Sequence, residues 1–233
     1  MTSLVEYQFV ESVSTITLND GKANAISPAM LAELNAALDK AESDAGVVVI
    51  RGREGLFSGG FDLSVFKSGD QREILSMLQG GAELAERLLG FPQPTIAACN
   101  GHAMAMGLFI LLSCDLRIGI DAGHRFGANE VAIGLTVPRF ATTVCRHRLT
   151  PAAFNCGLVL AQPFESSNAV NAGILDVTVT PDQFEKTVMG KAVACNSLDI
   201  KSHRATKQRA RAGLLSELRT SIELDCEDWS QRI

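Results

Sequence analysis

Residues 94–120, which read PTIAACNGHAMAMGLFILLSCDLRIGI, decide the fold class of this chain. Residues 94–99 and 116–120 are short apolar runs of the kind that form buried strands. Between these runs, residues 103–113 are apolar on every side, which indicates a helix inside the structure. A strand, a helix and a strand in this order predict parallel strands joined by a right-handed crossover. The chain is therefore expected to belong to the α/β class.

The part of the chain that precedes this stretch extends the same pattern. Residues 47–50 (VVVI) are a continuous β-branched run, typical of a strand covered on both faces. Ser27 and Pro28 mark a helix start, and apolar residues recur at helical spacing through residues 28–43. Two further predictions are a helix over residues 71–90 and an antiparallel hairpin over residues 5–10 and 13–18.

The last third of the chain has a different sequence pattern, which is mainly helical. From residue 150 onward, the patterns predict a short strand near residues 174–179 and helices at 151–161, 166–172, 181–196 and 202–230. We therefore divide the chain into a core over residues 1–150 and a helical C-terminal region over residues 151–233. This region is expected to pack on the core or on a neighbouring subunit.

The composition excludes several classes of protein. Of the 233 residues, 46% are hydrophobic and 20% are charged, as in globular rather than disordered chains. The net charge of −5 comes from interspersed acids and bases, which argues against nucleic acid as a partner. The N-terminus lacks the segments of a signal peptide, and no apolar run reaches the length of a membrane span. A cytoplasmic protein with no membrane partner is expected.

The cysteines and histidines show no pattern of metal ligands. The six cysteines are widely spaced, without a CxxC or Cys/His motif, and most have apolar neighbours in the sequence. They are expected to be reduced cysteines of the core, and no metal site is predicted.

Two glycine-containing stretches follow predicted strands. One is FSGGFDL at residues 57–63, and the other is NGHAMAMG at residues 100–107, which leads directly into the apolar helix. Adjacent glycines let backbone N–H groups face outward, and the first N–H groups of a helix have no partner within the helix. Two such donors at the carboxyl ends of parallel strands predict an oxyanion hole, which stabilises negative charge on a polarised carbonyl.

Four motifs in order resemble the crotonase (enoyl-CoA hydratase/isomerase) superfamily. That family's Lys-x-Asn-Ala segment resembles KANAI at residues 22–26, and its Phe-[Ser/Ala]-x-Gly-x-Asp-[Leu/Ile] loop resembles residues 57–63. Its Asn-Gly helix start, which ends in Cys-Asp, resembles residues 100–115. The segment that carries its catalytic glutamate resembles FGANEV at residues 126–131. The resemblance covers nearly the whole chain and implies a crotonase-like ββα spiral core with parallel sheets, in which residues 1–150 hold the acyl-CoA site, and an oligomerisation role for the C-terminal region.

The resemblance also implies catalytic roles. The thioester carbonyl of the substrate would lie between the backbone N–H groups of Gly59 and Met106, which would hold an enolate. Glu130 matches a catalytic glutamate of the family, although an ion pair with Arg125 or Arg139 is the alternative role for it. Hydratases of the family carry a second glutamate where this chain has Phe109. A single carboxylate suits proton transfer between two carbon atoms of the substrate, whereas water addition by two carboxylates lacks one partner.

The remaining candidate residues are expected to contact the substrate or to support the site. By resemblance, residues 22–26 would contact the adenine and pantetheine of CoA, and Lys22 would meet a phosphate or remain a solvated loop lysine. His102 would support the hole or touch substrate, and Asp62 would be a second acid or a brace of its loop. The predicted substrate-binding residues are Lys22, Ala23, Ala25, Ile26, Ser58, Gly60, Phe61, Asp62, Leu63, His102, Phe109, Leu135 and Pro138.

One segment of the C-terminal region is unusually basic. Residues 201–211 contain Lys201, His203, Arg204, Lys207, Arg209 and Arg211. Such a cluster is expected to be a solvated helix face or an anion site. As an anion site, it is a candidate for holding the adenine end of CoA.

The predicted function is the Δ3,Δ2 isomerisation of an enoyl-CoA, with Glu130 as the base. An enoyl-CoA hydratase, a thioester hydrolase or a decarboxylase with the same hole, and a non-catalytic acyl-CoA-binding protein, are the alternatives. The GxSxG motif of serine hydrolases and the GxGxxG motif of dinucleotide-binding proteins are absent. No cofactor is expected because CoA is part of the substrate, and the resemblance implies a homotrimer or hexamer.

Overall fold

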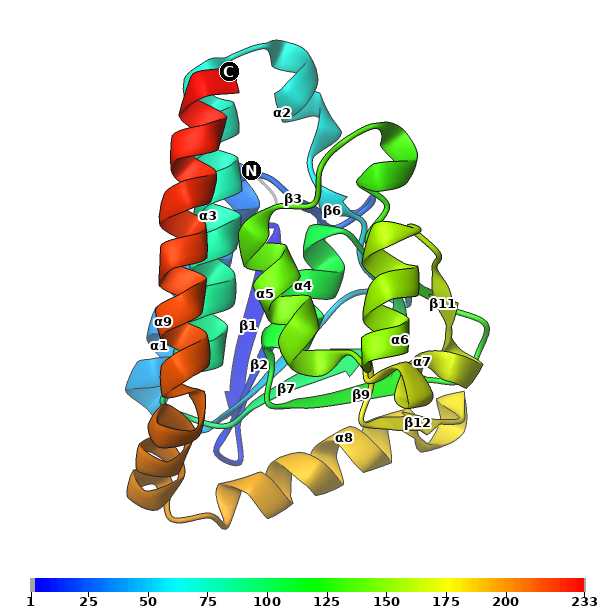
Figure 1. Ribbon diagram of the computed structural model, residues 1–233. Coiled ribbons are helices and arrows are strands. Elements are labelled where there is room, and N and C mark those ends of the chain that lie inside the picture. The colour runs from blue at the N-terminus through cyan, green and yellow to red at the C-terminus, as the bar shows by residue number, and fades with distance from the viewer. Residues whose placement is uncertain (1–2, 233) are drawn as a thin grey trace.

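The computed structural model describes residues 3–232, which form a mixed α/β protein with two main sheets (Figure 1). The larger sheet has the strand order β1-β2-β4-β7-β9-β12. Its strands are β1 (Val5–Val10), β2 (Val13–Leu18), β4 (Val47–Arg51), β7 (Thr95–Cys99), β9 (Leu116–Ile120) and β12 (Val177–Val179). β1 and β2 form the predicted antiparallel hairpin, and the other neighbours in this sheet are parallel. The predicted α/β class with parallel strands is confirmed.

A second sheet of short strands lies beside the first. Its order is β11-β10-β8-β5, and β3 pairs with β6 in a separate two-stranded sheet. The bounds are β3 (Ala25–Ile26), β5 (Gly55–Ser58), β6 (Gly60–Phe61), β8 (Gly101–Met104), β10 (Arg125–Gly127) and β11 (Phe164–Glu165). None of these strands was predicted, because runs of two to four residues carry no usable periodicity.

The helices agree with the predictions except at four places. Helices close to prediction are α1 (Pro28–Asp44), α3 (Gln71–Gly90), α7 (Ser166–Ala172), α8 (Pro181–Asn196) and α9 (Ile200–Arg232). The helix predicted from residue 103 begins later, as α4 (Met106–Ser113), because residues 101–104 pair as β8. The helix predicted over 151–161 is α6 (Pro151–Phe154) followed by a π-helical turn (Asn155–Val159). α2 (Leu63–Ser68) and α5 (Arg139–Arg148) were not predicted.

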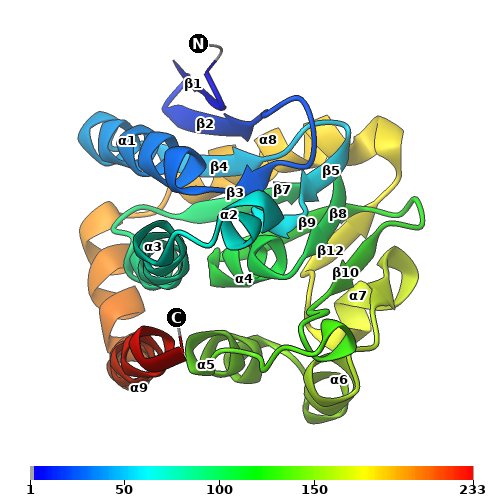
Figure 2. The same ribbon diagram turned by 90° about the horizontal axis from the view of Figure 1, so that it is seen from above.

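Alternation along the parallel strands explains how the large sheet is covered on both faces. Val47 and Val49 of β4 join the apolar cluster that contains Phe184 and Val188 of α8. Residues Val48 and Ile50 point to the opposite face and join the main core. In the view of Figure 2, α3 and α4 lie between these strands and a row formed by α9, α5 and α6. The run VVVI is therefore apolar throughout because each face of its strand is buried.

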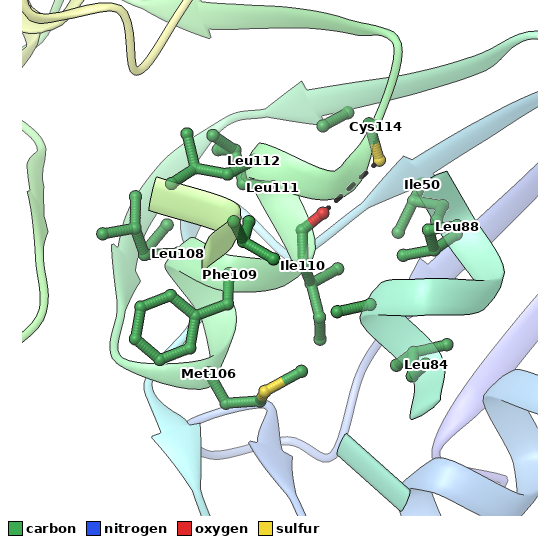
Figure 3. Packing of buried hydrophobic residues seen from close by; sticks show 14 of the residues in the cluster. Ile50, Leu84, Leu88, Met106, Leu108, Phe109, Ile110, Leu111, Leu112 and Cys114 are labelled. Atoms are coloured by element: carbon green, nitrogen blue, oxygen red, sulfur yellow. Dashed lines mark hydrogen bonds between the residues drawn. The ribbon is translucent and has the colours of Figure 1, made fainter. Parts of the chain in front are cut away.

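The apolar helix α4 occupies the middle of the molecule, as predicted. All eight of its residues are buried. Figure 3 shows its side chains pointing in several directions, with Leu84 and Leu88 of α3 on one side and the ring of Phe109 on the other. The helix therefore cannot shift without disturbing packing on every side.

The long helix α9 packs on α3 and α5 of its own chain. Its C-terminal end lies near α2 (Figure 1), where Trp229 contacts the apolar cluster of Val65 and Met77. The C-terminal region thus packs on the core of the same chain, while a role for it in oligomerisation stays a prediction.

The basic segment of α9 is neither a purely solvated face nor a free anion site. Lys201, Arg204 and Arg209 are exposed, but Lys207 and Arg211 turn inward to Asp115, at N–O distances of 2.7 and 2.8 Å. These two cations are therefore paired with a carboxylate of the core. Lys201, Arg204 and Arg209 keep their exposed charges, so the cluster has fewer cations for an anion than its sequence indicates.

The described cysteines are all free thiols, and Cys99, Cys114 and Cys145 are buried as expected. The other three are only partly buried, so the prediction of core cysteines holds for half of them. Across residues 3–232, the helices are all too short or too polar to cross a membrane.

Candidate active site

The N-terminus of α4 presents a backbone N–H without a partner. Met106 is the first residue of α4, so the helix provides no acceptor for its N–H, and no other hydrogen bond from it is found within residues 3–232. The preceding residue, Ala105, has φ 47° and makes no side-chain cap. The Ala105 N–H donates to the Gly127 carbonyl over 2.8 Å, which fixes the turn between β8 and α4. The predicted donor at residue 106 is therefore available to a ligand.

The prediction that the Gly59 N–H is a free donor of the oxyanion hole is wrong. This N–H donates to the Ala23 carbonyl over 2.8 Å and is therefore not available. Three residues further on, the Asp62 N–H donates to the Ile26 carbonyl of β3 over 3.2 Å. Because successive N–H groups of a strand point to opposite sides, the N–H of Phe61 points away from β3. The register of β6 therefore leaves Phe61, rather than Gly59, with the outward donor.

Gly60 leaves room for its own segment and the start of α4 to approach each other. Its φ of +100° is one that L side chains rarely adopt. A Cβ at this position would lie 2.8 Å from the Cβ of Ala105 and 3.4 Å from the Met106 nitrogen. Glycine at residue 60 therefore brings the 60–61 segment beside the free N–H of Met106. The Phe61 and Met106 amides come from adjacent segments, as an oxyanion hole requires.

Asn24 braces this loop, a role that the sequence analysis did not assign. It is fully buried with φ 46°, and its side-chain amide donates to the Phe57 carbonyl over 3.1 Å. Its own carbonyl accepts from the Ser58 hydroxyl over 2.7 Å. Asparagine tolerates positive φ and also provides the amide donor, which explains the residue type. Its place in the KANAI motif was the available signal.

Asp20 holds the same loop from its outer side. Its carboxylate accepts from the N–H groups of Lys22 (2.7 Å), Asn24 (2.8 Å) and Ala25 (2.9 Å). Burial alone would raise the pKa of Asp20, but these three N–H donors outweigh it and hold the pKa below its usual value. The loop that carries Lys22 and Ala23 is therefore fixed by backbone contacts.

Two basic residues, Lys22 and Arg53, meet at the outer edge of this loop through the Lys22 backbone. Lys22 is exposed, and the Arg53 guanidinium donates to the Lys22 carbonyl, with an Nε–O distance of 3.0 Å. Ala25 is half-buried and Ile26 is fully buried. This edge can attract a phosphate, whereas Ile26 belongs to the core and does not line an open surface.

Glu130 is a partly buried carboxylate without a counter-ion. One of its carboxylate oxygens, Oε2, is buried and has no hydrogen-bond partner, and the side chain makes no ion pair within residues 3–232. Arg139, a candidate partner, instead pairs with Asp225 and Asp228. Burial raises the pKa of Glu130, and only a backbone hydrogen bond opposes this. A carboxyl group with a raised pKa is suited to accept and return a proton near neutral pH.

The burial of Glu130 does not come from the apolar residues that follow it. Val131 and Ile133, which flank it in the sequence, are 45% and 56% exposed. The carboxylate instead lies within electrostatic reach of the fully buried Cys145 on α5, since its charge adds to burial in raising the pKa of that thiol. Glu130 is the third residue after Gly127, which bonds to Ala105, so the Glu130 Cα lies within about 11 Å of the Gly127 Cα.

Phe109 occupies the position of the absent second carboxylate and is 1% exposed. Its ring packs edge-on against Phe140 of α5 at 5.8 Å between centroids, and Phe140 in turn meets Trp229 at 6.5 Å. An apolar ring at residue 109 therefore joins α4 to α5 and provides no proton or water ligand. Whether it contacts substrate stays a prediction.

The other predicted residues have varied places. Asp62 caps α2 by accepting from the Ser64 N–H over 2.8 Å, as a loop brace does. His102 accepts from the Arg125 N–H at its Nδ1 over 2.9 Å and stacks edge-on with His124, so it braces β10 against β8. Leu63 and Leu135 are exposed, and Pro138 immediately precedes α5. In residues 3–232, no group of three or more His, Cys, Asp or Glu side chains could hold a metal ion.

Comparisons with known proteins define the class to which this arrangement belongs. Residues 8–232 match the family model described as enoyl-CoA hydratase/isomerase. The chain therefore belongs to the enoyl-CoA hydratase/isomerase family of the crotonase superfamily, and it is an enzyme of this type.

Relatives with both names are similar to this chain. A probable enoyl-CoA hydratase of Bacillus subtilis is 34% identical over 82% of this chain and 74% of its own length. A solved enoyl-CoA hydratase/isomerase family protein of Pseudomonas syringae is 40% identical, covers 96% of this chain and 97% of its own, and has a TM-score of 0.93. An enoyl-CoA isomerase of Mycobacterium tuberculosis in its apo form is 38% identical over 100% of both chains, with a TM-score of 0.92. The names agree on the family and differ on the reaction.

Proposed function

We propose that this protein moves the double bond of a 3-enoyl-CoA to the 2-position, with Glu130 as the only proton carrier. The observation that carries the proposal is the Glu130 side chain itself, which is partly buried, has a raised pKa and has no counter-ion among the residues that the structure describes. Phe109 supports it because the position that would supply a second carboxylate is filled by a core aromatic ring.

The reaction balances with a single base. The Glu130 carboxylate takes a proton from C2 of the substrate, and the electron pair moves into the thioester, so that negative charge gathers on the carbonyl oxygen. The N–H groups of Met106 and Phe61 donate to that oxygen and stabilise the dienolate. The protonated Glu130 then gives the proton to C4, the C2–C3 double bond forms, and the carboxylate is restored.

The outer loop offers a place for the CoA moiety. We propose that Lys22 and Arg53, which meet through the Lys22 backbone, attract CoA phosphates. The basic segment of α9 is not proposed for this role, because Lys207 and Arg211 are paired with Asp115. We expect the enzyme to act in the cytoplasm as a homotrimer or hexamer, and these two points stay predictions.

Hydration of a 2-enoyl-CoA is the second candidate, and the name of the Bacillus subtilis relative favours it. It would require a second group to hold and activate water. Asp62 is the nearest acid in the motif, but its carboxylate is used to cap α2. Isomerisation therefore fits the described side chains better.

The two candidates are separated by their products. Purified protein should be incubated with a 3-enoyl-CoA and, separately, with a 2-enoyl-CoA, followed by ultraviolet absorbance and mass spectrometry. We expect conjugated 2-enoyl thioester from the first substrate and little 3-hydroxyacyl thioester from the second. Rapid hydration together with no isomerisation would contradict the proposal and support the hydratase.

A further inference from the structure

Asp225 of α9 is a buried carboxylate that the proposed chemistry does not use. The residue is 3% exposed. Its two oxygens accept from the backbone N–H groups of Arg139 (3.0 Å) and Phe140 (2.9 Å), which are the first two residues of α5. Pro138, which precedes them, offers no side-chain cap. A carboxylate from another helix therefore caps α5, where it also complements the positive end of the helix dipole.

The N-terminus of α5 is the downstream anchor of the segment that carries Glu130. The upstream anchor is the Gly127 carbonyl, which accepts from the Ala105 N–H. Between the two anchors, the Leu135 N–H closes a turn on the Glu130 carbonyl over 2.8 Å. Leu135 itself is 52% exposed, and the apolar residues of the segment that pack on the main core, Ala128 and Val137, lie near its two ends. The position of Glu130 therefore depends on the two ends of its segment.

Helix α5 also forms part of the surroundings of the Glu130 carboxylate. Cys145, on α5, is buried, and the charge of Glu130 adds to burial in raising the pKa of its thiol. Phe140 meets Phe109 of α4, the helix whose first N–H belongs to the proposed oxyanion hole. A displacement of the α5 N-terminus would change the environment of the base and loosen the contact with α4.

We propose that Asp225 is a positioning residue for Glu130: it fixes the N-terminus of α5, and α5 keeps the Glu130 carboxylate in its desolvated place. This inference rests on the proposed role of Glu130 as the base. Asp225 acts through Arg139 and Phe140 and makes no contact with Glu130 in the described structure.

The test uses one variant and two matched controls in the full chain. Asp225→Asn removes the charge and one of the two acceptors that hold α5. Arg139→Ala removes the ion pair to Asp225, which spans 3.3 Å, and leaves both backbone bonds in place. Lys207→Met removes a buried contact of α9 with the core, roughly 25 Å away along the helix, and so controls for a general loosening of α9.

The decisive readout is the pKa of Glu130 in the protein without substrate. Carbon-13 NMR of labelled glutamate side chains measures it, and Glu130→Gln assigns the signal. We expect Asp225→Asn to lower this pKa toward the ordinary glutamate value, because water reaches the carboxylate, while both controls leave it unchanged. In the same proteins, kcat for 3-enoyl-CoA isomerisation should fall about tenfold or more in Asp225→Asn alone, with little change in KM.

The outcomes separate this inference from the proposed function. An unchanged Glu130 pKa in Asp225→Asn, or an equal shift in Lys207→Met, overturns the positioning role even if the wild type isomerises its substrate. A shift in Asp225→Asn alone supports that role even if the wild type turns over no enoyl-CoA. Should Asp225→Asn fail to fold, Asp225→Glu keeps the charge and displaces the carboxylate by one methylene. In Asp225→Glu we expect the Glu130 pKa to fall by a smaller amount. An unchanged Glu130 pKa in this variant overturns the positioning role.

Discussion

At the residue scale, Met106 has two separate roles in the site. Its N–H is free at the start of α4, and its side chain is fully buried against α3. A Cβ built on Gly81 of α3 would lie 3.2 Å from the Met106 sulfur and 2.6 Å from the Phe61 ring. Both side chains therefore fill the space over Gly81, next to the two amides that would hold the thioester oxygen.

Shortening Met106 should enlarge the space for the acyl chain without removing the N–H donor. In Met106→Ala we expect the ratio of kcat/KM for long-chain over short-chain 3-enoyl-CoA to rise about tenfold, measured by conjugated-thioester absorbance. The cavity should lower the free energy of unfolding by about 2–5 kcal/mol. Leu112→Ala, a buried change at the other end of α4, is the control. An equal change of the ratio in that control would argue against a role of Met106 in chain length.

The raised pKa of Glu130 also has a consequence for stability. A carboxyl group whose pKa is higher in the folded than in the unfolded protein favours folding while it is protonated and opposes folding once it ionises. We therefore expect Glu130→Gln to have a higher free energy of unfolding than the wild type at pH 8, and the difference to vanish at pH values below the unfolded glutamate pKa. Urea unfolding at several pH values measures this. A variant less stable than the wild type at pH 8 would show that the ionised carboxylate is stabilised instead.

Sequence motifs located these residues better than they located the bonds between them. The motif at 57–63 indicates a donor loop, but which N–H is free depends on how β6 pairs with β3, and Gly59 proved to be bonded to Ala23. Asp225 lies 95 residues after Glu130 (225 − 130), in a helix with no motif of its own. Its role depends on tertiary packing and could not be predicted from local pattern.

At the scale of elements, Asp115 joins three segments. It accepts from the Thr95 N–H of β7 over 2.8 Å and receives Lys207 and Arg211 from α9, directly after α4 ends. Burial alone would raise the pKa of Asp115, but the two cations outweigh it and hold the pKa below its usual value. The Cys-Asp end of the family motif thus fastens the C-terminal helix to the sheet.

Removing this charge should loosen α9. For Asp115→Asn we expect a loss of about 3–5 kcal/mol in the free energy of unfolding at neutral pH, because two buried cations lose their partner. Since the folded pKa of Asp115 is lowered, its contribution is present above the unfolded aspartate pKa and is lost as the pH falls through the folded pKa. Chemical denaturation at pH 7 and at a pH well below the unfolded aspartate pKa should show a large and then a smaller difference. A loss that is the same at both values would mean that ionisation of Asp115 is not its source.

Elements with a long apolar run or a clear periodicity could be predicted from the sequence, and elements without either could not. α3 and the parallel strands β4, β7 and β9 were predicted, because long amphipathic or continuous apolar runs give a clear signal. The helix predicted from residue 103 overlaps the end of β8, since an apolar residue such as Ala103 fits a buried strand and a buried helix equally well. α5 has polar residues on much of its surface and takes its cap from Asp225, so its sequence contains no start signal.

At the scale of the whole molecule, the candidate site is assembled from segments far apart in the sequence. The 22–26 loop, the 57–63 loop and the start of α4 meet through Ala23, Gly60 and Ala105, and α9 returns over α3 and α5 to fix the helix that follows Glu130. Figure 2 shows this last layer beside the central helices. Helix α9 therefore supports the candidate site through its contacts with α3 and α5.

The most direct test of the central claim compares wild type with Glu130→Gln on a 3-enoyl-CoA. The account predicts that the wild type forms the conjugated 2-enoyl thioester and that kcat in the variant falls by about 10²–10⁴-fold, while the affinity for the acyl-CoA and the fold are retained. Absorbance kinetics and calorimetric binding on the same preparations measure both quantities. A variant that isomerises within tenfold of the wild type would contradict the role of Glu130 as the only base.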